Sequence, residues 1–232
     1  MTYDLPPELD VEIDGPIRIV RLNRPDELNA TNHELHRGLA DLFPQLDADA
    51  DARAAVITGN GRAFSAGGDF NYLDELTRDE DLRRQTLVDG RRIVTGMVAC
   101  RLPIVAAVNG PAVGLVAADG GPVTWPLLTS LQLAKEYALT GDRIPARRAA
   151  EIGLANHVCP DGEVLEQALA CARRIAELPP RAVEDTKRIL NLHLERAVLA
   201  ALDFALTAED RSFTSPEMRA NLDRLLSRNR DA

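Results

Sequence analysis

The sequence lacks any apolar run long enough to cross a membrane, and its N-terminus lacks the basic and apolar regions of a signal peptide. It also lacks clusters of Lys and Arg. The formal net charge is −9, which argues against a nucleic-acid-binding surface because phosphate binding requires clustered cations. We therefore expect a protein of the cytoplasm that binds neither a membrane nor a nucleic acid.

Cysteine is scarce and aromatic residues make up only 4% of the chain. Cys100, Cys159 and Cys171 are odd in number, widely spaced and without a C-x-x-C pair, so neither a disulfide framework nor a zinc site is predicted and we interpret all three as core thiols. His33 and His36 lie three residues apart, but the sequence supplies no third ligand. We interpret them as solvated surface histidines and predict no metal site.

What the chain does contain is enough apolar residue, 45% of 232, for one sizeable core. Residues 9–13 and 17–22 alternate apolar with polar around an Asp-Gly pair, which predicts a β-hairpin. Residues 54–58 and 104–108 are continuous apolar runs, typical of buried parallel strands. Helical patterns separate these runs, and the alternation predicts an α/β protein.

The other expected elements are mostly helices. Thr31 or Asn32 is expected to cap a helix that Pro44 ends or kinks. The charged stretch 77–84 has little apolar periodicity and is expected to be a mobile connection. Further along, the pattern predicts helices over residues 87–98, about 125–139 and 146–152, one more strand over 155–159, and almost wholly helical structure over 163–228 with breaks at 178–180 and 215–216.

The stretch Ala-Phe-Ser-Ala-Gly-Gly-Asp-Phe, residues 63–70, follows the apolar run that ends at residue 58. Asp69 is a good N-cap, so the stretch is predicted to form a strand-to-helix corner. Adjacent glycines let another group approach the main chain, and free amides at a helix start suit an anion or a developing oxyanion. The alternative is a tight turn that binds nothing.

Several motifs together resemble the crotonase superfamily, the enoyl-CoA hydratase/isomerase family, over essentially the whole chain. Their order and spacing carry the resemblance, since each is weak alone. They are Asn-Arg-Pro at 23–25 with Leu-Asn-Ala at 28–30, the corner at 63–69, Pro-Ile-Val-Ala-Ala-Val-Asn-Gly at 103–110, Gly-Gly at 120–121, Leu-Thr-Gly-Asp-Arg-Ile at 139–144, Ala149 with Gly-Leu-Ala at 153–155, and Pro180 with Ala182, Val183 and Lys187.

The resemblance implies an α/β fold in which residues 1–160 form a spiral of ββα units and residues 161–232 form a helical oligomerisation region. Such regions build homotrimers, often paired into hexamers. The implied substrate is an acyl-CoA, whose coenzyme A is part of the substrate, so no separate cofactor is expected.

The family polarises a thioester carbonyl with two backbone N–H groups, which map by motif to Gly68 and Leu115. Removing one such donor typically costs about 3 kcal/mol. By the same resemblance, two loops would hold the coenzyme A moiety. Their residues are Arg24, Pro25, Asp26 and Leu28 in the first loop and Ala66, Gly67, Gly68, Asp69 and Phe70 in the second.

The sequence departs from the family pattern near residues 114–116, where the segment that carries two catalytic glutamates in the hydratases is absent. Asp119 is the nearest carboxylate and the candidate acid–base group, although an N-capping or loop-ordering role is the favoured interpretation of it. A parallel strand at 104–108 also needs a crossover of roughly a dozen residues. Either a helix and a strand are deleted, or the natural protein carries residues here that this sequence omits. We favour omission, because losing an internal crossover should cost more than the ~5–15 kcal/mol that keeps a domain folded.

Three functions remain open at this stage. The leading hypothesis is an enoyl-CoA hydratase, with an enoyl-CoA isomerase of the same family as the alternative. A non-catalytic acyl-CoA-binding trimer follows instead if the glutamate segment is truly absent. A serine peptidase of similar fold is disfavoured, because no Ser, His and Asp stand at matching positions.

Overall fold

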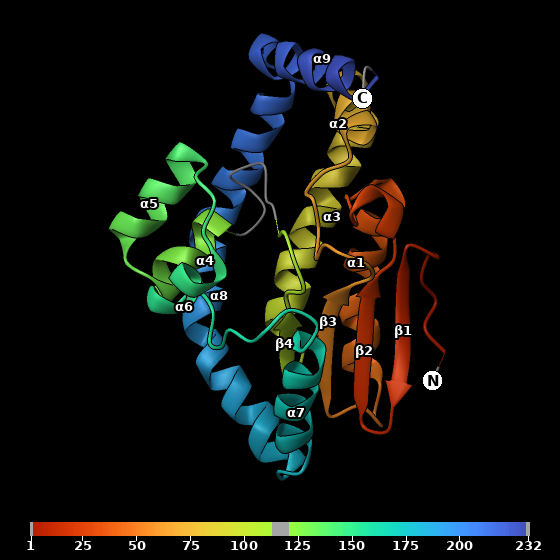
Figure 1. Cartoon of the computed structure of the whole chain (residues 1–232), viewed down its shortest axis with the longest axis vertical. Helices are drawn as coiled ribbons and strands as arrows, with labels where there is room; N and C mark the ends of the chain where they lie inside the picture. The colour runs from red at the N-terminus through yellow and green to blue at the C-terminus, as the bar shows by residue number, and fades with distance from the viewer. Residues whose placement is uncertain (1, 113–120, 231–232) are drawn as a thin grey trace.

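The computed structural model describes residues 2–112 and 121–230, with side chains up to 227. Within these residues four strands form one sheet in the order β1-β2-β3-β4 (Figure 1). The strands are β1 (Leu9–Asp14), β2 (Ile17–Leu22), β3 (Ala54–Gly59) and β4 (Ile104–Ala107). β1 and β2 are antiparallel, whereas β2, β3 and β4 are parallel. The predicted hairpin and the predicted parallel strands are confirmed.

The helices account for most of the remaining chain. In order they are η1 (Pro25–Glu27), α1 (His33–Ala48), α2 (Phe70–Arg78), α3 (Glu80–Ala99), α4 (Gly121–Leu128), α5 (Leu131–Thr140), α6 (Ala146–Glu151), α7 (Val164–Ala176), α8 (Pro180–Phe213) and α9 (Pro216–Arg230). No helix among the described residues is both long and apolar enough to cross a membrane.

Alternate residues of β2 face two different apolar clusters, as a pleated strand requires. Val20 and Leu22 pack on one face of the sheet with apolar residues of α1. Ile17 and Ile19 pack on the other face with α7. The sheet is therefore covered on both faces, which explains why β3 is a nearly continuous apolar run.

Helix α1 starts as predicted but does not end at Pro44. The Asn32 side chain accepts a hydrogen bond from the Leu35 N–H at 2.9 Å and caps the helix. The helix then continues through Pro44 to Ala48. A proline inside a helix costs about 3 kcal/mol, but Leu42 and Leu46 on either side of it are fully buried, and their packing outweighs that cost.

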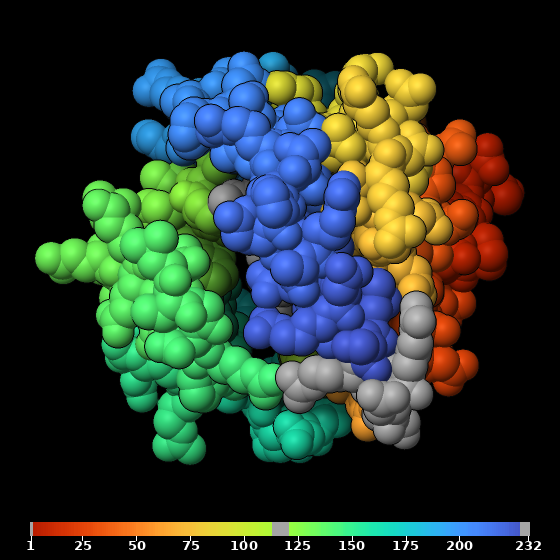
Figure 2. All heavy atoms as spheres, turned by 90° about the horizontal axis from the view of Figure 1, so that it is seen from above, coloured from red at the N-terminus to blue at the C-terminus, as the bar shows by residue number. Residues whose placement is uncertain are grey.

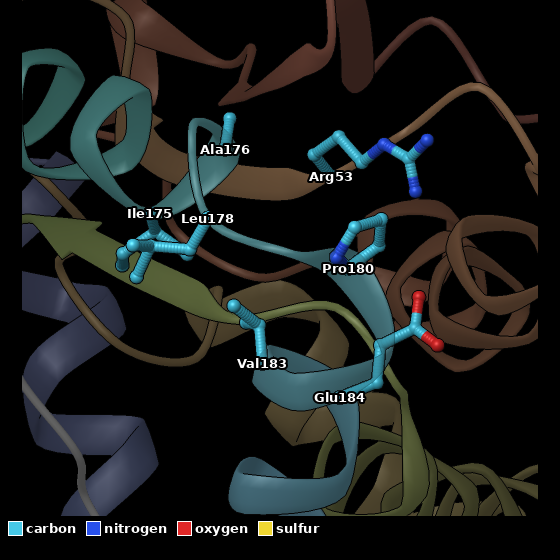
Figure 3. Close-up of a pocket in the computed structure, with 7 residues that line it drawn as sticks. All are labelled: Arg53, Ile175, Ala176, Leu178, Pro180, Val183 and Glu184. Carbon is cyan, nitrogen blue, oxygen red and sulfur yellow. The ribbon is translucent and has the colours of Figure 1, made fainter.

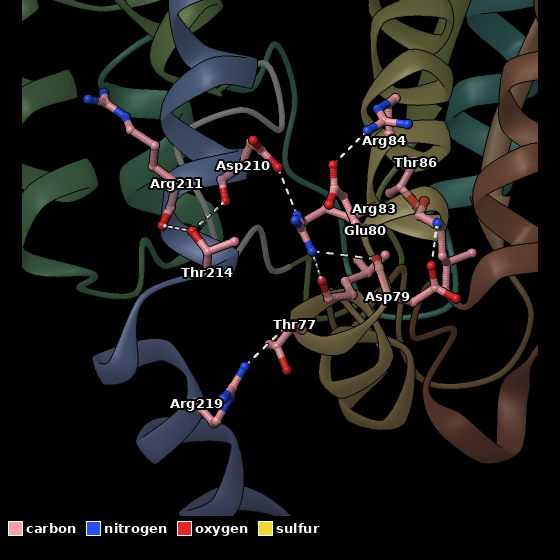
Figure 4. Close-up of polar contacts among 12 residues, drawn as sticks. Thr77, Asp79, Glu80, Arg83, Arg84, Thr86, Asp210, Arg211, Thr214 and Arg219 are labelled. Atoms are coloured by element: carbon pink, nitrogen blue, oxygen red, sulfur yellow. Dashed lines mark hydrogen bonds and ion pairs between the residues drawn. The ribbon is translucent and has the colours of Figure 1, made fainter.

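The charged stretch 77–84, expected to be a mobile connection, is instead helical on both sides of Asp79: it contains the end of α2 and the start of α3. Asp79 caps α3, its Oδ1 accepting from the Leu82 N–H at 2.9 Å. Arg83 is buried, and its guanidinium donates to the Leu76 carbonyl at 2.9 Å and to Asp210 of α8 at 2.8 Å (Figure 4). The partner at Asp210 is invisible to periodicity, because it comes from the C-terminal part of the chain.

The C-terminal helices lie against α2 and α3, as the view from above shows (Figure 2). Phe213 and Leu222 pack with Leu73 and Leu76 of α2 in one apolar cluster. The Arg219 guanidinium donates to the Thr77 carbonyl at 3.2 Å (Figure 4). Cations near the last carbonyls of α2 also complement its helix dipole.

Two expectations for the middle of the chain are wrong. The single helix over 125–139 is two helices, because Ser130 breaks it and its hydroxyl accepts from the Leu133 N–H at 3.2 Å, capping α5. Residues 155–159 form no strand.

The cysteines are all free thiols, but only Cys100 is buried, so the interpretation of Cys159 and Cys171 as core residues is also wrong.

β4 lies at the edge of the described sheet, which makes it less buried than predicted. Of its four residues only Ala107 is buried, and Ala106 is exposed. The described residues that follow it contain no further strand. An uncovered parallel edge strand is unusual and agrees with the absence of a crossover near residues 114–116.

Two side chains of helix α8 donate hydrogen bonds to backbone carbonyl groups at and just after the carboxyl end of α3. Lys187 Nζ donates to the carbonyl oxygens of Cys100 at 2.5 Å and Leu102 at 2.7 Å. Asn191 Nδ2 donates to the Val98 carbonyl at 2.7 Å. These bonds satisfy carbonyl groups that a helix end leaves without partners.

We expect Lys187→Met to destabilise the protein by about 1–3 kcal/mol, because it leaves two partly buried carbonyl groups without a charged donor. Urea unfolding followed by circular dichroism measures the change. Lys135→Met, at an exposed position of α5, is the control and should change stability by less than about 0.5 kcal/mol. Equal stability of the two variants would contradict the assignment.

Candidate functional site

The two loops singled out in the sequence lie together at the carboxyl edge of the sheet. β2 and β3 are parallel neighbours, so the segments that follow Leu22 and Gly59 leave the sheet at the same edge. The Ala66 N–H donates to the Leu28 carbonyl at 2.9 Å. This edge is where parallel sheets commonly place their functional loops.

Asn29 joins these loops from a left-handed backbone conformation. Its φ is 55°, its residue is fully buried, and its Nδ2 donates to the carbonyl oxygens of Asn60 and Ala63, both at 2.8 Å. Its Oδ1 accepts from the Arg24 N–H at 2.8 Å. No structural role for Asn29 was predicted from the sequence. Asparagine is nevertheless one of the few residues that tolerate this left-handed conformation.

The Gly68 N–H is directed away from the loop that carries Thr31. Thr31 and Gly68 form a parallel bridge, in which the Thr31 N–H donates to the Gly67 carbonyl at 2.7 Å and the Asp69 N–H donates to the Thr31 carbonyl at 3.0 Å. Successive residues of an extended segment direct their N–H and C=O groups to opposite sides. The Gly68 N–H therefore faces away from Thr31, and it donates to no acceptor among the described residues.

The backbone at this corner requires glycine at residue 67. Gly67 has a φ of 93°, a region that residues with a Cβ rarely adopt. The conformation turns the chain sharply between Ala66, which is bonded to Leu28, and Gly68. The corner thus leaves Gly68 partly exposed.

Helix α2 begins directly after this amide. The Asp69 Oδ1 accepts from the N–H groups of Asn71 at 2.9 Å and Tyr72 at 3.4 Å, which confirms Asp69 as the predicted N-cap. The amino end of a helix carries a partial positive charge. A negative charge that develops in front of Gly68 is therefore stabilised both by the N–H and by the helix.

A third segment, residues 109–112, approaches the same corner from β4. The Pro111 carbonyl accepts from the N–H groups of Phe64 at 3.1 Å and Ser65 at 3.0 Å. Gly110 permits this approach, since a Cβ there would lie 2.3 Å from the Arg62 carbonyl oxygen. Residues 111 and 112 therefore lie against Phe64 and Ser65, on the strand side of the glycine corner. Leu115 and Asp119 lie outside the described residues, and their roles stay predictions.

Comparison with known proteins decides the family. The family model described as enoyl-CoA hydratase/isomerase matches residues 12–117 and 111–228. The chain belongs to the enoyl-CoA hydratase/isomerase family. The family match comes in two pieces that overlap over residues 111–117, the point at which the sequence departs from the family pattern.

Relatives of this family member agree along most of their length. A crystal structure of an enoyl-CoA hydratase/isomerase from Mycobacterium paratuberculosis is 57% identical, with a TM-score of 0.93 over 96% of this chain and 100% of that chain. Another from Xanthobacter autotrophicus Py2 is 29% identical, with a TM-score of 0.81 over 96% and 93%. A putative enoyl-CoA hydratase of Thermus thermophilus is 32% identical over 206 residues, covering 76% of this chain and 81% of the relative. The predicted crotonase resemblance and α/β fold class are confirmed, and the protein is an acyl-CoA enzyme of the hydratase/isomerase type.

The residues predicted to hold coenzyme A gather at the carboxyl edge of the sheet, but they differ in how far they are exposed. Pro25 and Asp26 are exposed, and Leu28, Ala66 and Phe70 are partly exposed. Their assignment as coenzyme A contacts stays a prediction.

Arg24, also predicted to lie near coenzyme A, has its guanidinium engaged within the fold. Nη2 donates to Asp69 Oδ2 at 3.1 Å, and Nη1 donates to the Ala30 carbonyl. Any contact of Arg24 with a phosphate would have to compete with these two bonds.

His33 and His36 are not solvated surface residues, which corrects the sequence interpretation. His36 belongs to α1, and its ring faces Gly90 of α3. Burial lowers the pKa of His36 to about 4, although Asp89 opposes the shift. The ring centroids of His33 and Tyr72 are 5.9 Å apart. In the part of the chain that the structure describes, no three His, Cys, Asp or Glu side chains gather in a way that would hold a metal ion.

Neutral His36 makes the fold sensitive to acid. A histidine whose pKa is lower in the folded state binds its proton more readily when unfolded, so stability is present above pH ~6.5 and is lost as pH falls toward 4. We expect the free energy of unfolding to fall by about 1–3 kcal/mol less over this range in His36→Gln than in the wild type. Urea midpoints at pH 7, 5.5 and 4 measure the difference. The exposed His157→Gln is the control, and identical pH profiles for wild type and His36→Gln would refute the assignment.

A shallow hollow lies elsewhere on the molecule (Figure 3). It is lined by Arg53, Ile175, Ala176, Leu178, Pro180, Val183 and Glu184. Arg53 directly precedes β3, so the hollow lies at the amino end of that strand, opposite the edge that carries Gly68. It is therefore separate from the candidate active site.

Proposed function

We propose that this protein is an enoyl-CoA hydratase that adds water across the double bond of a 2-enoyl-CoA. The observation that carries the proposal is the Gly68 N–H, which has no acceptor among the described residues and is directed away from Thr31 at the start of α2.

The chemistry explains why such an amide matters. When the oxygen of water bonds to C3 of the enoyl group and loses a proton to a base, the electron pair of the C2–C3 double bond forms a new double bond between C1 and C2. The π pair of the carbonyl then moves onto the thioester oxygen and forms an enolate. A proton then adds to C2 and the carbonyl is restored. A fixed N–H group stabilises the enolate oxygen more than the neutral carbonyl, and so lowers the barrier. Leu115 is proposed as the second donor.

Proton transfer requires a carboxylate close to the reacting carbons. Asp119 is the proposed candidate in this sequence, which has neither family glutamate. That absence favours a second candidate function, a non-catalytic acyl-CoA-binding protein that keeps the polarising amide. The isomerase reaction of the same family is the remaining alternative.

We also propose that coenzyme A lies along the loop edge formed by Pro25, Asp26, Leu28, Ala66 and Phe70, and that the protein works in the cytoplasm as a homotrimer or hexamer. Helix α8 supports oligomerisation, because several of its large apolar side chains are exposed. They are Ile189 (63%), Leu190 (64%), Leu199 (65%) and Phe204 (72%). Light scattering coupled to size-exclusion chromatography tests the state, and a 25.3 kDa monomer would exclude it.

Four measurements on the purified protein separate the functions. An intact mass that exceeds 25.3 kDa by about the weight of a helix and a strand would support the omission of the glutamate segment from this sequence. Loss of crotonyl-CoA absorbance on hydration tests the proposed reaction. Binding of crotonyl-CoA without turnover would exclude the hydratase and support the binder, whereas migration of the double bond of a 3-enoyl-CoA would support the isomerase.

A further inference from the structure

The carboxylate of Asp69, next to the proposed polarising amide, accepts hydrogen bonds from two different parts of the chain. Its Oδ1 caps α2 through the N–H of Asn71 at 2.9 Å. Its Oδ2 accepts from Arg24 Nη2 at 3.1 Å. Its own main-chain N–H is held by the Thr31 carbonyl at 3.0 Å. Asp69 is therefore the point where the helix, the glycine corner and the loop of residues 24–31 meet.

Arg24 bridges the same elements from the other side. Besides Asp69 it binds the Ala30 carbonyl, and Thr31 next to Ala30 supplies both bridge bonds to the corner. The two charged side chains are only 15% and 17% exposed, so water competes weakly for their hydrogen bonds. A planar guanidinium can hold two acceptors in a fixed relation, which an ammonium cannot.

We propose that Arg24 and Asp69 are positioning residues that fix the direction of the Gly68 N–H, an inference that rests on the proposed role of this amide. Two adjacent glycines give the corner little stiffness of its own, because neither has a side chain that packs. Its direction is therefore set by the bonds on either side of it. Opening the Arg24–Asp69 pair releases the loop that carries Thr31, and the N–H loses its alignment.

This role differs from a direct contact with coenzyme A. A positioning pair changes how strongly the thioester carbonyl is polarised but leaves the affinity for coenzyme A itself unchanged. An Arg24 that binds a phosphate would do the reverse, with a salt-dependent loss of affinity. The two roles are therefore distinguishable in one set of variants.

The test uses a conjugated 2,4-dienoyl-CoA, whose absorption shifts to longer wavelength when its carbonyl is polarised on binding. The variants are Arg24→Met, Asp69→Asn and the double mutant. Asparagine keeps an oxygen for the N-cap but loses the charge. We expect each single variant to lose more than half of the wild-type spectral shift and, in hydration of crotonyl-CoA, to lower kcat about ten- to a hundred-fold with KM and the dissociation constant of free coenzyme A within about threefold.

The double mutant should be no worse than the single variants, because residues that act as one unit are not additive. Arg24→Lys, which can hold one acceptor but not both, should recover part of the shift. Arg78→Met is the matched control, because it removes an exposed ion pair with Asp74 at the far end of α2 and should leave the shift intact.

Each outcome decides the matter. A wild-type protein that binds the dienoyl-CoA without a spectral shift refutes the proposed role of Gly68 and the positioning role with it. A wild-type shift that persists in folded Arg24→Met and Asp69→Asn refutes only the positioning role. A more than tenfold loss of affinity for free coenzyme A with the shift intact shows instead that Arg24 binds the phosphates.

Discussion

Replacing Gly68 with proline is expected to lower kcat/KM for crotonyl-CoA by about 10²–10³-fold, because proline has no N–H to donate to the enolate oxygen. The Gly68 N–H donates to no described residue, so the substitution removes no hydrogen bond seen in the fold. Steady-state hydration kinetics measure the loss. Circular dichroism and the affinity for free coenzyme A establish that the variant is folded and binds.

Gly68→Ala is the matched control for this variant. It adds the same Cβ, which would lie 3.0 Å from the terminal methyl groups of Leu73, but it keeps the N–H. Leu73 is flexible enough to move aside, so alanine should cost less than about tenfold in kcat/KM. Comparable losses for alanine and proline would mean that space, and not the donor, is what matters at this position.

The second large effect concerns stability and lies in a buried ion pair between the sheet and the end of α1. Arg18 Nε donates to Asp49 Oδ2 at 2.6 Å, and the two side chains are 2% and 1% exposed. Tyr3 donates its hydroxyl to the same oxygen at 2.6 Å. We expect Asp49→Ala to cost about 3–5 kcal/mol, because it leaves a buried guanidinium without its partner. For a chain of this length, the thermal midpoint should fall by about 6–20 °C.

Two further variants test this explanation. Asp14→Ala removes an exposed carboxylate that pairs with Arg173 at 3.1 Å, and it should cost no more than about 1 kcal/mol. Replacing both partners, in Arg18→Met with Asp49→Leu, should destabilise less than Asp49→Ala alone, since no buried charge is then left unpaired. A double mutant less stable than the single one would overturn the argument.

The same pair fixes how Asp49 responds to acid. Burial alone would raise its pKa, but the hydrogen bonds from Arg18 and Tyr3 outweigh burial and lower the pKa from 3.8 to about 2. A lowered carboxyl pKa means that the stabilisation is present above pH ~3.8 and is lost as pH falls toward 2. Asp49 thus weakens the fold only in strong acid, below the range in which His36 acts.

The sequence predicted the parts of the site that depend on local chemistry. Asp69 is an N-cap because a carboxylate that precedes a helix can accept its free amides, whatever the rest of the chain does. Gly67 stands where the backbone turns with a positive φ. The sequence did not predict the hydrogen bonds by which Asn29 joins the two loops, because its partners at Asn60 and Ala63 are more than thirty residues away.

The wrong expectations share a cause. The charged stretch 77–84 was judged by local propensity, which tertiary packing overrode, and packing likewise carries α1 through Pro44, one of the two outcomes expected there being an end of the helix. Leu42 and Leu46 keep α1 continuous, and Asp210 gives Arg83 a partner from a distant helix. The edge exposure of β4 likewise depends on which strand is its neighbour, and not on its own apolar residues.

By itself the sequence determined the four strands of the sheet, the glycine corner, the family and the missing glutamate segment, since each follows from residue types at short range or from their order along the chain. Only the tertiary structure decided that the Gly68 N–H faces away from Thr31 and that Arg24 binds Asp69 across 45 residues. The direction of an amide is set by the hydrogen bonds on either side of it, and here those bonds come from a loop that is brought to the corner by the parallel pairing of β2 and β3.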